Sequence, residues 1–343
     1  WTFDGAEAAW HPAVLIRMAG TLGLRMTLSA TRNMRTCPCA DMSISPSFCP
    51  ARALSTVIHP SAVVHPEAEI NESAEVGPHC VVGPGVRIGS GVRLLGSVHV
   101  DGLTTLGPGV TVYPFVTLGH PPQDLKHRGE ATRLEVGEGV TIREHVSVHA
   151  GTVGGGGVTT IGSSCLLMAG VHVGHDCSLG ARTIVASGSL LAGHVTLGEG
   201  VVVGGQCAVH QHVHLGRGAY LGGGSVLARD LGPHTLAFGN RARARGLNLV
   251  GLRRAQNPRE DVRGALIAYR LLFGGQASGF AHPPPHMQGG KTLAERARQV
   301  VACTAQLGPI AQELADFILN PNRRMPMCGH ADNVSSTSSS PDT

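Results

Sequence analysis

Aliphatic residues return at every sixth position over most of this chain, and that period limits the possible folds more than any other feature. The repeat runs from Ile58 to Val226 with two interruptions. A helix would place apolar residues three and four apart, and a half-buried strand would alternate them. A beat of six instead predicts a parallel β-helix, in which each repeat is a short strand with one aliphatic residue pointing inward.

Small residues support the same fold. Gly often follows the aliphatic residue, as in Val76-Gly77 and Leu179-Gly180. We expect these glycines to form the corners, because Gly adopts positive φ at low cost. The 48 Gly and the aromatic content of 3% suit a thin prism with tight corners better than a bulky core.

The repeat divides the chain into four predicted parts. Residues 58–231 form the β-helix, 232–320 form a helical domain with a loop insertion at 274–290, and 321–343 form a disordered, Ser-rich tail. Helix-capping patterns at Asn257-Pro258-Arg259-Glu260 and Thr292-x-x-Glu295 support the helical part. Residues 1–57 are rich in Arg, Ser, Thr and Ala and poor in acids, which predicts a transit peptide; ordinary disordered sequence is the alternative. We therefore expect an organelle, a mitochondrion before a plastid, or the cytoplasm if this segment is not a targeting signal.

Charge and cysteine content narrow the function. The net charge of +4 is mild, and no Lys/Arg run carries interleaved aromatics, so nucleic acid is not an expected partner. No stretch is apolar for long enough to span a bilayer. Several of the nine Cys fall inside the repeat, where we expect buried thiols rather than metal ligands.

Three repeats per coil would stack residues that are 18 positions apart. His175 would then lie over Gly193, and Gly193 over Gln211. His194 and His210 lie within one residue of this line, and His149 joins it if Gly154–Gly157 loops out. The predicted edge cluster is His149, His175, His194 and His210.

Such an edge suits two chemistries, metal binding by His or general-base catalysis. Asp176 beside His175 favours the second, because a carboxylate-paired imidazole can take a proton from a hydroxyl near neutral pH. The N–H of Gly193, one coil away, is placed to stabilise an oxyanion. We also expect the missing Cβ of Gly193 to let a substrate approach.

Several motifs resemble the acyl-carrier-protein:UDP-N-acetylglucosamine O-acyltransferases, hexapeptide-repeat enzymes of lipid A biosynthesis. The resemblance covers residues 58–273 densely. The motifs are Gln123-Asp124-Leu125-Lys126, His149-Ala150-Gly151-Thr152, Leu167 to Cys177, Leu191-Ala192-Gly193-His194, Ala208-Val209-His210-Gln211, Gly246-Leu247-Asn248 and Gly251-Leu252-Arg253-Arg254.

This resemblance implies a mainly β fold with a left-handed β-helix, a homotrimer with sites between subunits, and no cofactor beyond the phosphopantetheine thioester of acyl carrier protein. The implied reaction moves an (R)-3-hydroxyacyl group from acyl carrier protein to the 3-hydroxyl of UDP-N-acetylglucosamine. His175 would be the base, Asp176 its partner and Gly193 the oxyanion donor. Substrate-binding roles would fall to Gln123, Asp124, Lys126, His149, His172, His194, His210, Gln211, Asn248 and Arg254, and Gly223 would match the position that limits acyl length.

The chain departs from the family pattern at Ala150, Val250 and Ala255, where the family usually has a basic, an acidic and a basic residue. Three alternatives stay open. The related N-acyltransferase carries an extra N-terminal domain, for which 1–57 is short. A γ-type carbonic anhydrase places two ligand His five apart, whereas His172 and His175 are three apart. A purely structural β-helix would have no need of the His175, Asp176 and Gly193 set.

Overall fold

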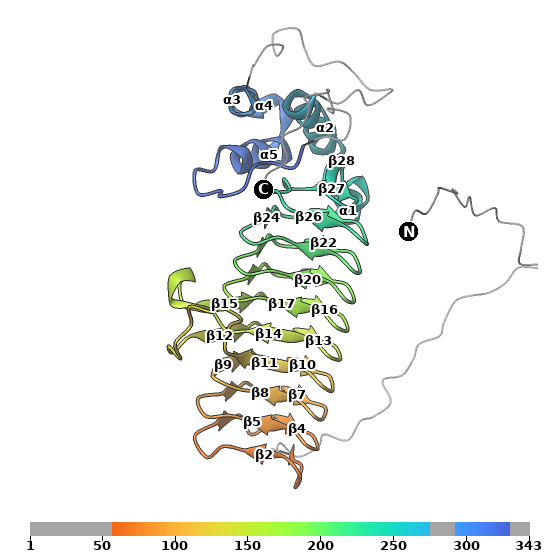
Figure 1. The fold of residues 1–343 in the computed structure, drawn as a ribbon. Helices are drawn as coiled ribbons and strands as arrows, with labels where there is room; N and C mark the ends of the chain where they lie inside the picture. The colour runs from red at the N-terminus through yellow and green to blue at the C-terminus, as the bar shows by residue number, and fades with distance from the viewer. Residues whose placement is uncertain (1–56, 275–291, 330–343) are drawn as a thin grey trace, which may run out of the picture. The chain divides into compact units, whose positions relative to one another are not determined.

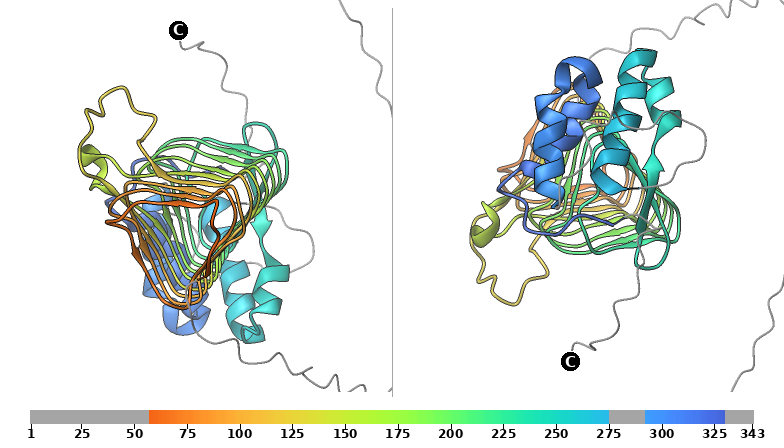
Figure 2. Two further views of the ribbon diagram at one scale, coloured as in Figure 1. Left: turned by 90° about the horizontal axis from the view of Figure 1, so that it is seen from below. Right: turned by 90° about the horizontal axis from the view of Figure 1, so that it is seen from above.

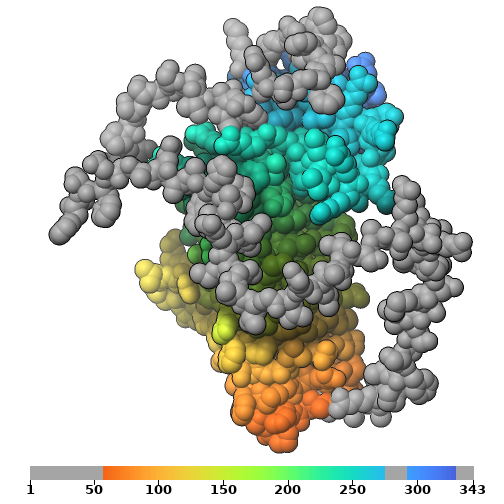
Figure 3. Space-filling view, turned by 90° about the vertical axis from the view of Figure 1, so that its right-hand side faces the viewer, coloured from red at the N-terminus to blue at the C-terminus, as the bar shows by residue number. Residues whose placement is uncertain are grey.

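The computed structural model describes residues 57–274 and 292–329. The sequence predictions made for 1–56, 275–291 and 330–343 lie outside these ranges. Two-residue strands alternate with short turns and wind into stacked coils (Figure 1). Seen along the stack, the coils have a triangular outline (Figure 2), and their surfaces lie directly on one another (Figure 3).

Each side of the prism is one sheet, in which the coil strands pair in parallel. Sheet A holds β1 (Val57–Ile58), β4 (Glu75–Val76), β7 (Arg93–Leu94), β10 (Thr111–Val112), β13 (Thr141–Ile142), β16 (Leu166–Leu167), β19 (Ile184–Val185), β22 (Val202–Val203), β25 (Tyr220–Leu221), β27 (Thr235–Phe238) and β28 (Arg243–Leu247). Sheet B holds β2 (Val63–Val64), β5 (Val81–Val82), β8 (His99–Val100), β11 (Thr117–His120), β14 (Ser147–His149), β17 (His172–Val173), β20 (Leu190–Leu191), β23 (Ala208–Val209) and β26 (Val226–Leu227). Sheet C holds β3 (Glu69–Ile70), β6 (Arg87–Ile88), β9 (Leu103–Leu106), β12 (Arg133–Val136), β15 (Val158–Ile161), β18 (Ser178–Leu179), β21 (Thr196–Leu197) and β24 (His214–Leu215).

The predicted register is confirmed. In uninterrupted coils, strand partners are 18 residues apart, as Val76 and Leu94 are. The second residue of each two-residue strand points inward, and Leu94, Leu167 and Leu215 are at most 1% exposed. Burying one such side chain contributes about 1.5–3 kcal/mol, so the repeated aliphatic position supplies the main stabilisation of the coil.

The corner glycines were predicted from the low cost of positive φ for Gly, and that explanation is wrong. Gly77 and Gly180, which follow the inward residue, do not have positive φ. A Cβ on Gly77 would lie 2.5 Å from the carbonyl oxygen of Leu95 in the next coil, so close stacking of the coils requires Gly there. Positive φ occurs instead three residues after the inward residue, and His79 and Ser97 take it as well as Gly85 and Gly91.

The C-terminal part, predicted as a helical domain at 232–320, begins with two strands before its helices. Strand β27 extends sheet A in parallel with β25, and β28 adds an antiparallel partner. The helices follow: α1 (Leu249–Arg254), α2 (Arg259–Phe273), α3 (Leu293–Ala302), α4 (Thr304–Leu307) and α5 (Pro309–Leu319). Their buried residues form a separate apolar cluster. Within the described ranges, no helix combines the length and the hydropathy needed to cross a membrane.

Polar contacts attach this part to the last coil. Arg217 Nε donates to Glu313 Oε1 at 2.9 Å, and His234 Nε2 lies 3.2 Å from Glu313 Oε2. Burial raises the pKa of Glu313, but the hydrogen bonds from His234 and Arg217 outweigh it and lower the pKa to about 2.

The predicted disorder from 321 onward is wrong for residues 321–329. The guanidinium of Arg323 lies 3.0 Å from the fully buried carboxylate of Asp230, and Cys328 N–H donates to the Asp230 carbonyl. This segment therefore continues the fold against the end of the β-helix, because the buried Asp230 carboxylate requires a cationic partner.

Candidate functional site

The corner between sheets B and C carries the candidate site. His175, Gly193 and Gln211 occupy the same position in three successive coils, as the register predicts. The next position in the same coils holds Asp176, His194 and His212, all with φ near +60°. Asp and His tolerate this left-handed conformation better than most residues, since their side chains bond locally.

Two insertions leave the prism at this same corner in the two preceding coils. One joins β11 to β12 through residues 121–132, and the other joins β14 to β15 through 150–157. They project together from one corner in Figure 2. The second contains a 3-10 turn, η1 (Val153–Gly155), capped by Thr152. The insertions lie beside His175, His194 and His212, which we call the histidine column. They therefore shield part of this column from solvent.

His175 and Asp176 form a close pair. Nδ1 of His175 lies 2.7 Å from Oδ2 of Asp176, whose side chain is 1% exposed. Burial raises the pKa of Asp176, but hydrogen bonds from Thr152 and His175 outweigh it and hold the pKa below its usual value. The ionised carboxylate fixes the proton of His175 on Nδ1, which leaves Nε2 free to accept a proton.

Gly193 lies directly beneath the imidazole of His175. A Cβ on Gly193 would come within 2.6 Å of Cε1 and 2.7 Å of Nε2 of that ring. The missing side chain therefore makes room for the base itself, which is a more direct reason for Gly than the substrate approach expected from the sequence. Among the described residues, the Gly193 N–H donates to no acceptor, so it can serve an oxyanion beside the base.

Two predicted histidines continue the cluster toward the N-terminal coils. The rings of His149 and His172 meet edge to face at 5.0 Å, and Nδ1 of His172 lies 2.8 Å from the Ser147 hydroxyl. Burial, together with the charges of His172, His120 and His175, lowers the pKa of His149 to about 4. A neutral His149 at pH 7 can orient a substrate by hydrogen bonding without adding positive charge to the site.

The column also extends toward the C-terminus through a residue that the sequence analysis missed. His194 meets His175 edge to face at 5.0 Å and stacks on His212 at 4.4 Å. Arg324 Nη1, from the segment predicted to be disordered, lies 3.5 Å from His212 Nδ1. Adding 18 to 194 finds His212, but no sequence signal places Arg324 there.

A cleft of about 380 Å³ opens between the column and the two insertions. Predicted residues from distant segments meet in it, because the insertions leave the same corner as the column. Its lining includes Asp124 and Lys126 from the first insertion, Thr152 from the second, His194 and His212 from the column, and Arg324.

The remaining predicted residues do not meet His175 within one chain. His210 and Gln211 lie on the same corner but are exposed, and His212 takes the stacked place expected for His210. Gln123 is exposed on the first insertion. Asn248 caps α1 through its Oδ1 and donates from Nδ2 to Gly218, and Arg254 ends that helix. Gly223 lies at the other corner of sheet B, between β25 and β26.

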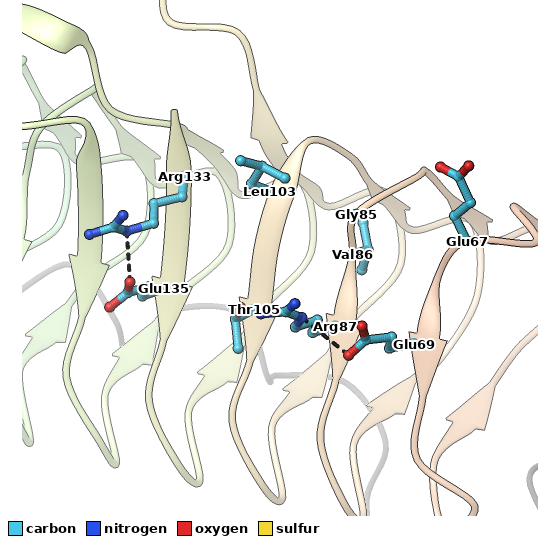
Figure 4. A pocket seen from close by; sticks show the side chains of 9 residues that line it. All are labelled: Glu67, Glu69, Gly85, Val86, Arg87, Leu103, Thr105, Arg133 and Glu135. Atoms are coloured by element: carbon cyan, nitrogen blue, oxygen red, sulfur yellow. Dashed lines mark ion pairs between the residues drawn. The ribbon is translucent and has the colours of Figure 1, made fainter. Parts of the chain in front are cut away.

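A second hollow, of about 460 Å³, lies against sheet C in the N-terminal coils (Figure 4). Four of its charged groups form two ion pairs, Arg87 with Glu69 at 3.1 Å and Arg133 with Glu135 at 2.9 Å. Leu103, Thr105 and Gly85 complete much of its lining, and no His, Lys or Cys contributes. We therefore place the chemistry at the histidine corner.

Comparisons with known proteins agree with the geometry. The family described as "Udp N-acetylglucosamine O-acyltransferase; Domain 2" matches residues 230–326, and the bacterial transferase hexapeptide family matches 55–90 and 158–193. A curated acyl-[acyl-carrier-protein]--UDP-N-acetylglucosamine O-acyltransferase from Caulobacter vibrioides is 47% identical over 231 residues, covering 67% of this chain and 82% of that protein. The chain belongs to the UDP-N-acetylglucosamine O-acyltransferase family. It is an O-acyltransferase, as the resemblance implied.

Other members of the O-acyltransferase family support this assignment. The Paracoccus denitrificans enzyme is 44% identical over 64% of this chain and 77% of its own. Crystal structures of UDP-N-acetylglucosamine acyltransferases from Moraxella catarrhalis and from Arabidopsis match with TM-scores of 0.71 and 0.68 and identities of 34% and 31%. Each match covers 79% of this chain, together with 99% of the Moraxella catarrhalis chain and 100% of the Arabidopsis chain. The predicted fold class, a left-handed β-helix with C-terminal helices, is confirmed.

Proposed function

We propose that the protein transfers an (R)-3-hydroxyacyl group from acyl carrier protein to the 3-hydroxyl of UDP-N-acetylglucosamine, the first step of lipid A synthesis. The acyl carrier protein and UDP-N-acetylglucosamine named for its relatives support both substrates. The observation that carries the proposal is the buried His175–Asp176 pair, with Nδ1 and Oδ2 at 2.7 Å, stacked on Gly193.

The geometry performs this reaction in two proton transfers. Nε2 of His175 takes the proton of the sugar hydroxyl as its oxygen attacks the thioester carbonyl. The Gly193 N–H stabilises the oxyanion of the tetrahedral intermediate, while Asp176 stabilises the imidazolium of His175. When the intermediate collapses, the C–S bond breaks and the departing phosphopantetheine thiolate takes the proton from the His175 imidazolium. No cofactor is required beyond that thioester.

A homotrimer is part of the proposal, for two reasons. Asn248 and Arg254 have implied substrate roles but do not reach the histidine corner in one chain, so a neighbouring subunit would bring them there. The outward positions of sheet B also carry no Lys, Arg, Asp or Glu, whereas those of sheets A and C carry ion pairs such as Glu75–Arg93 and Glu69–Arg87. The uncharged face is Val63, Val81, His99, Thr117, Ser147, His172, Leu190, Ala208 and Val226.

The decisive experiment is an assay of the purified chain with labelled UDP-N-acetylglucosamine and a panel of 3-hydroxyacyl carrier proteins of different length. We expect turnover with the wild type and a loss of about 10²- to 10⁴-fold in kcat for His175→Ala, because a general base contributes that much. His65→Ala, an exposed histidine of the same corner in the first coil, is the matched control. Turnover by His175→Ala equal to that of the control would refute the assignment.

Two further measurements address the rest of the proposal. Light scattering of the same preparation is expected to give three times the mass of one chain. Import assays with residues 1–57 fused to a fluorescent protein are expected to show entry into an organelle, the mitochondrion first. Cytoplasmic fluorescence would contradict the transit peptide while leaving the enzymatic assignment intact.

A further inference from the structure

The carboxylate of Asp176 has two imidazoles within reach. Its Oδ2 is 2.7 Å from Nδ1 of His175 and 3.7 Å from Nε2 of His194. Both contacts involve the same oxygen, so a movement of Oδ2 toward His194 would lengthen its hydrogen bond to His175. Only the contact with His175 creates the base, so something must hold the carboxylate in place.

Thr152, at the start of the second insertion, binds both oxygens of that carboxylate. Its N–H donates to Asp176 Oδ1 at 2.7 Å, and its hydroxyl donates to Oδ2 at 2.6 Å. The same hydroxyl accepts from the Gly155 N–H at 3.2 Å, which caps η1. A hydroxyl has one hydrogen to donate and two lone pairs, so Thr152 can make both bonds at once.

The backbone of the insertion also packs on the carboxylate. A Cβ on Gly155 would lie 2.3 Å from each carboxylate oxygen of Asp176. From the other side, the Asp176 N–H donates to Thr159 Oγ1 at 2.9 Å. Asp176 is therefore held at its main chain by the strand β15 and at its carboxylate by the insertion that precedes that strand.

We propose that Thr152 is a positioning residue, which fixes the carboxylate of Asp176 on His175 and keeps it from His194. This inference rests on the proposed acyl transfer. The N–H and the hydroxyl of Thr152 donate to the carboxylate oxygens from the side of the insertion, so Oδ2 stays within hydrogen-bond distance of His175 Nδ1. Thr152 acts only through Asp176 and contacts none of the reacting atoms.

The test compares Thr152→Val with wild type and with Thr160→Val. Val has nearly the shape of Thr but no hydroxyl, and a hydrogen bond to a charged group is worth about ten- to a hundredfold in equilibrium, so kcat should fall by about that factor. KM for both substrates should change little, because binding groups are untouched. Thr160 lies on the same insertion-bearing coil, and within the described ranges its hydroxyl donates only to the Ser178 hydroxyl, so Thr160→Val should keep wild-type kcat.

A pH profile separates positioning from simple loss of packing. The hydroxyl of Thr152 is one of the donors that lower the pKa of Asp176, so its removal raises that pKa. The acid limb of the kcat profile should therefore move to higher pH in Thr152→Val. Thr152→Ser keeps the hydroxyl but lacks the methyl group, so its kcat and the acid limb of its pH profile should match those of wild type.

Each outcome decides the inference. Wild-type kcat in a folded Thr152→Val, or a loss in Thr152→Ser as large as in Thr152→Val, would overturn it. If Thr152→Val does not fold, Thr152→Ala removes the same donor without added bulk and replaces it in the comparison. If the wild-type protein shows no turnover, the proposed function is wrong. The contact between Thr152 and Asp176 is then tested by whether the pKa of Asp176 is higher in Thr152→Val than in wild type.

Discussion

The first coils and the coils from Ser147 to His214 have the same backbone and the same register, but only the later ones form a site. In the first coils, outward residues form exposed ion pairs, such as Arg87 with Glu69 at side-chain exposures of 66% and 71%. In the later coils, the corner holds His175 and Asp176 at 11% and 1%. Stacking alone thus aligns side chains, and burial by the insertions turns an aligned corner into a reactive one.

The largest effect is expected from breaking the buried pair. Asp176→Asn keeps the shape but removes the charge that stabilises the imidazolium, and it can present its amide to His175 Nδ1, so kcat should fall by at least about a hundredfold. Asp101 occupies the same corner before the insertions, and among the described residues its carboxylate accepts a hydrogen bond only from the Gly102 N–H. Asp101→Asn should therefore retain activity, and an equal loss in both variants would contradict the comparison.

The second effect concerns the space beneath the base. Gly193→Ala puts a methyl group where the His175 ring lies, so the ring must rotate and kcat should fall about tenfold or more. At Gly205 the nearest atom to a Cβ is the Ser187 carbonyl oxygen at 3.4 Å, so Gly205→Ala should leave that ring in place. Crystal structures of the two variants would show the difference, and an unmoved His175 in Gly193→Ala would disprove it.

A third prediction extends the comparison to Glu313, the partly buried acid that joins the helices to the last coil. The pKa of Glu313 is lowered to about 2 in the folded protein from an ordinary value of 4.5. Its stabilisation is therefore fully present above about pH 4.5 and is lost as the pH falls through 2. Melting curves of wild type and Glu313→Gln should differ most at neutral pH and converge as the pH falls to about 2; a constant difference would argue against this carboxylate.

A smaller effect is expected at the C-terminal end of the column. Burial lowers the pKa of His212, and the charge of Arg324 lowers it further. Arg324→Ala should raise the pKa of His212 and, less strongly, that of His194, where Arg324 is the last of several causes. NMR titration of the imidazole resonances measures both shifts, and an unchanged His212 would show that Arg324 does not lie over it.

The smallest effect is expected in the first coils. Glu69→Gln breaks an exposed ion pair, which is worth about 0–1 kcal/mol and is screened by salt. The melting temperature should change by no more than about a few degrees, and the change should shrink further in high salt. A large fall in the melting temperature would mean that the exposed ion pairs of the first coils contribute substantially to the stability of the prism.

The sequence alone determined the coil. A period of six specifies which side of each strand is buried, because a shift of one residue would expose every aliphatic side chain. The resemblance to the hexapeptide-repeat acyltransferases supplied three repeats per coil and hence the 18-residue register. From that register followed the stacking of His175 on Gly193, and the motif resemblance supplied the reaction. The same register places His212, 18 residues after His194, on this corner.

The tertiary structure alone decided what surrounds that stack. The contacts of Thr152 with Asp176 and of Arg324 with His212 join segments 24 and 112 residues apart through insertions and a tail that obey no repeat. Gly77 likewise owes its identity to the carbonyl of Leu95 in the next coil and not to its own φ. Periodic apolar burial is a local rule and can be read along the chain, whereas satisfaction of a buried carboxylate depends on whichever donors the folded chain brings to it.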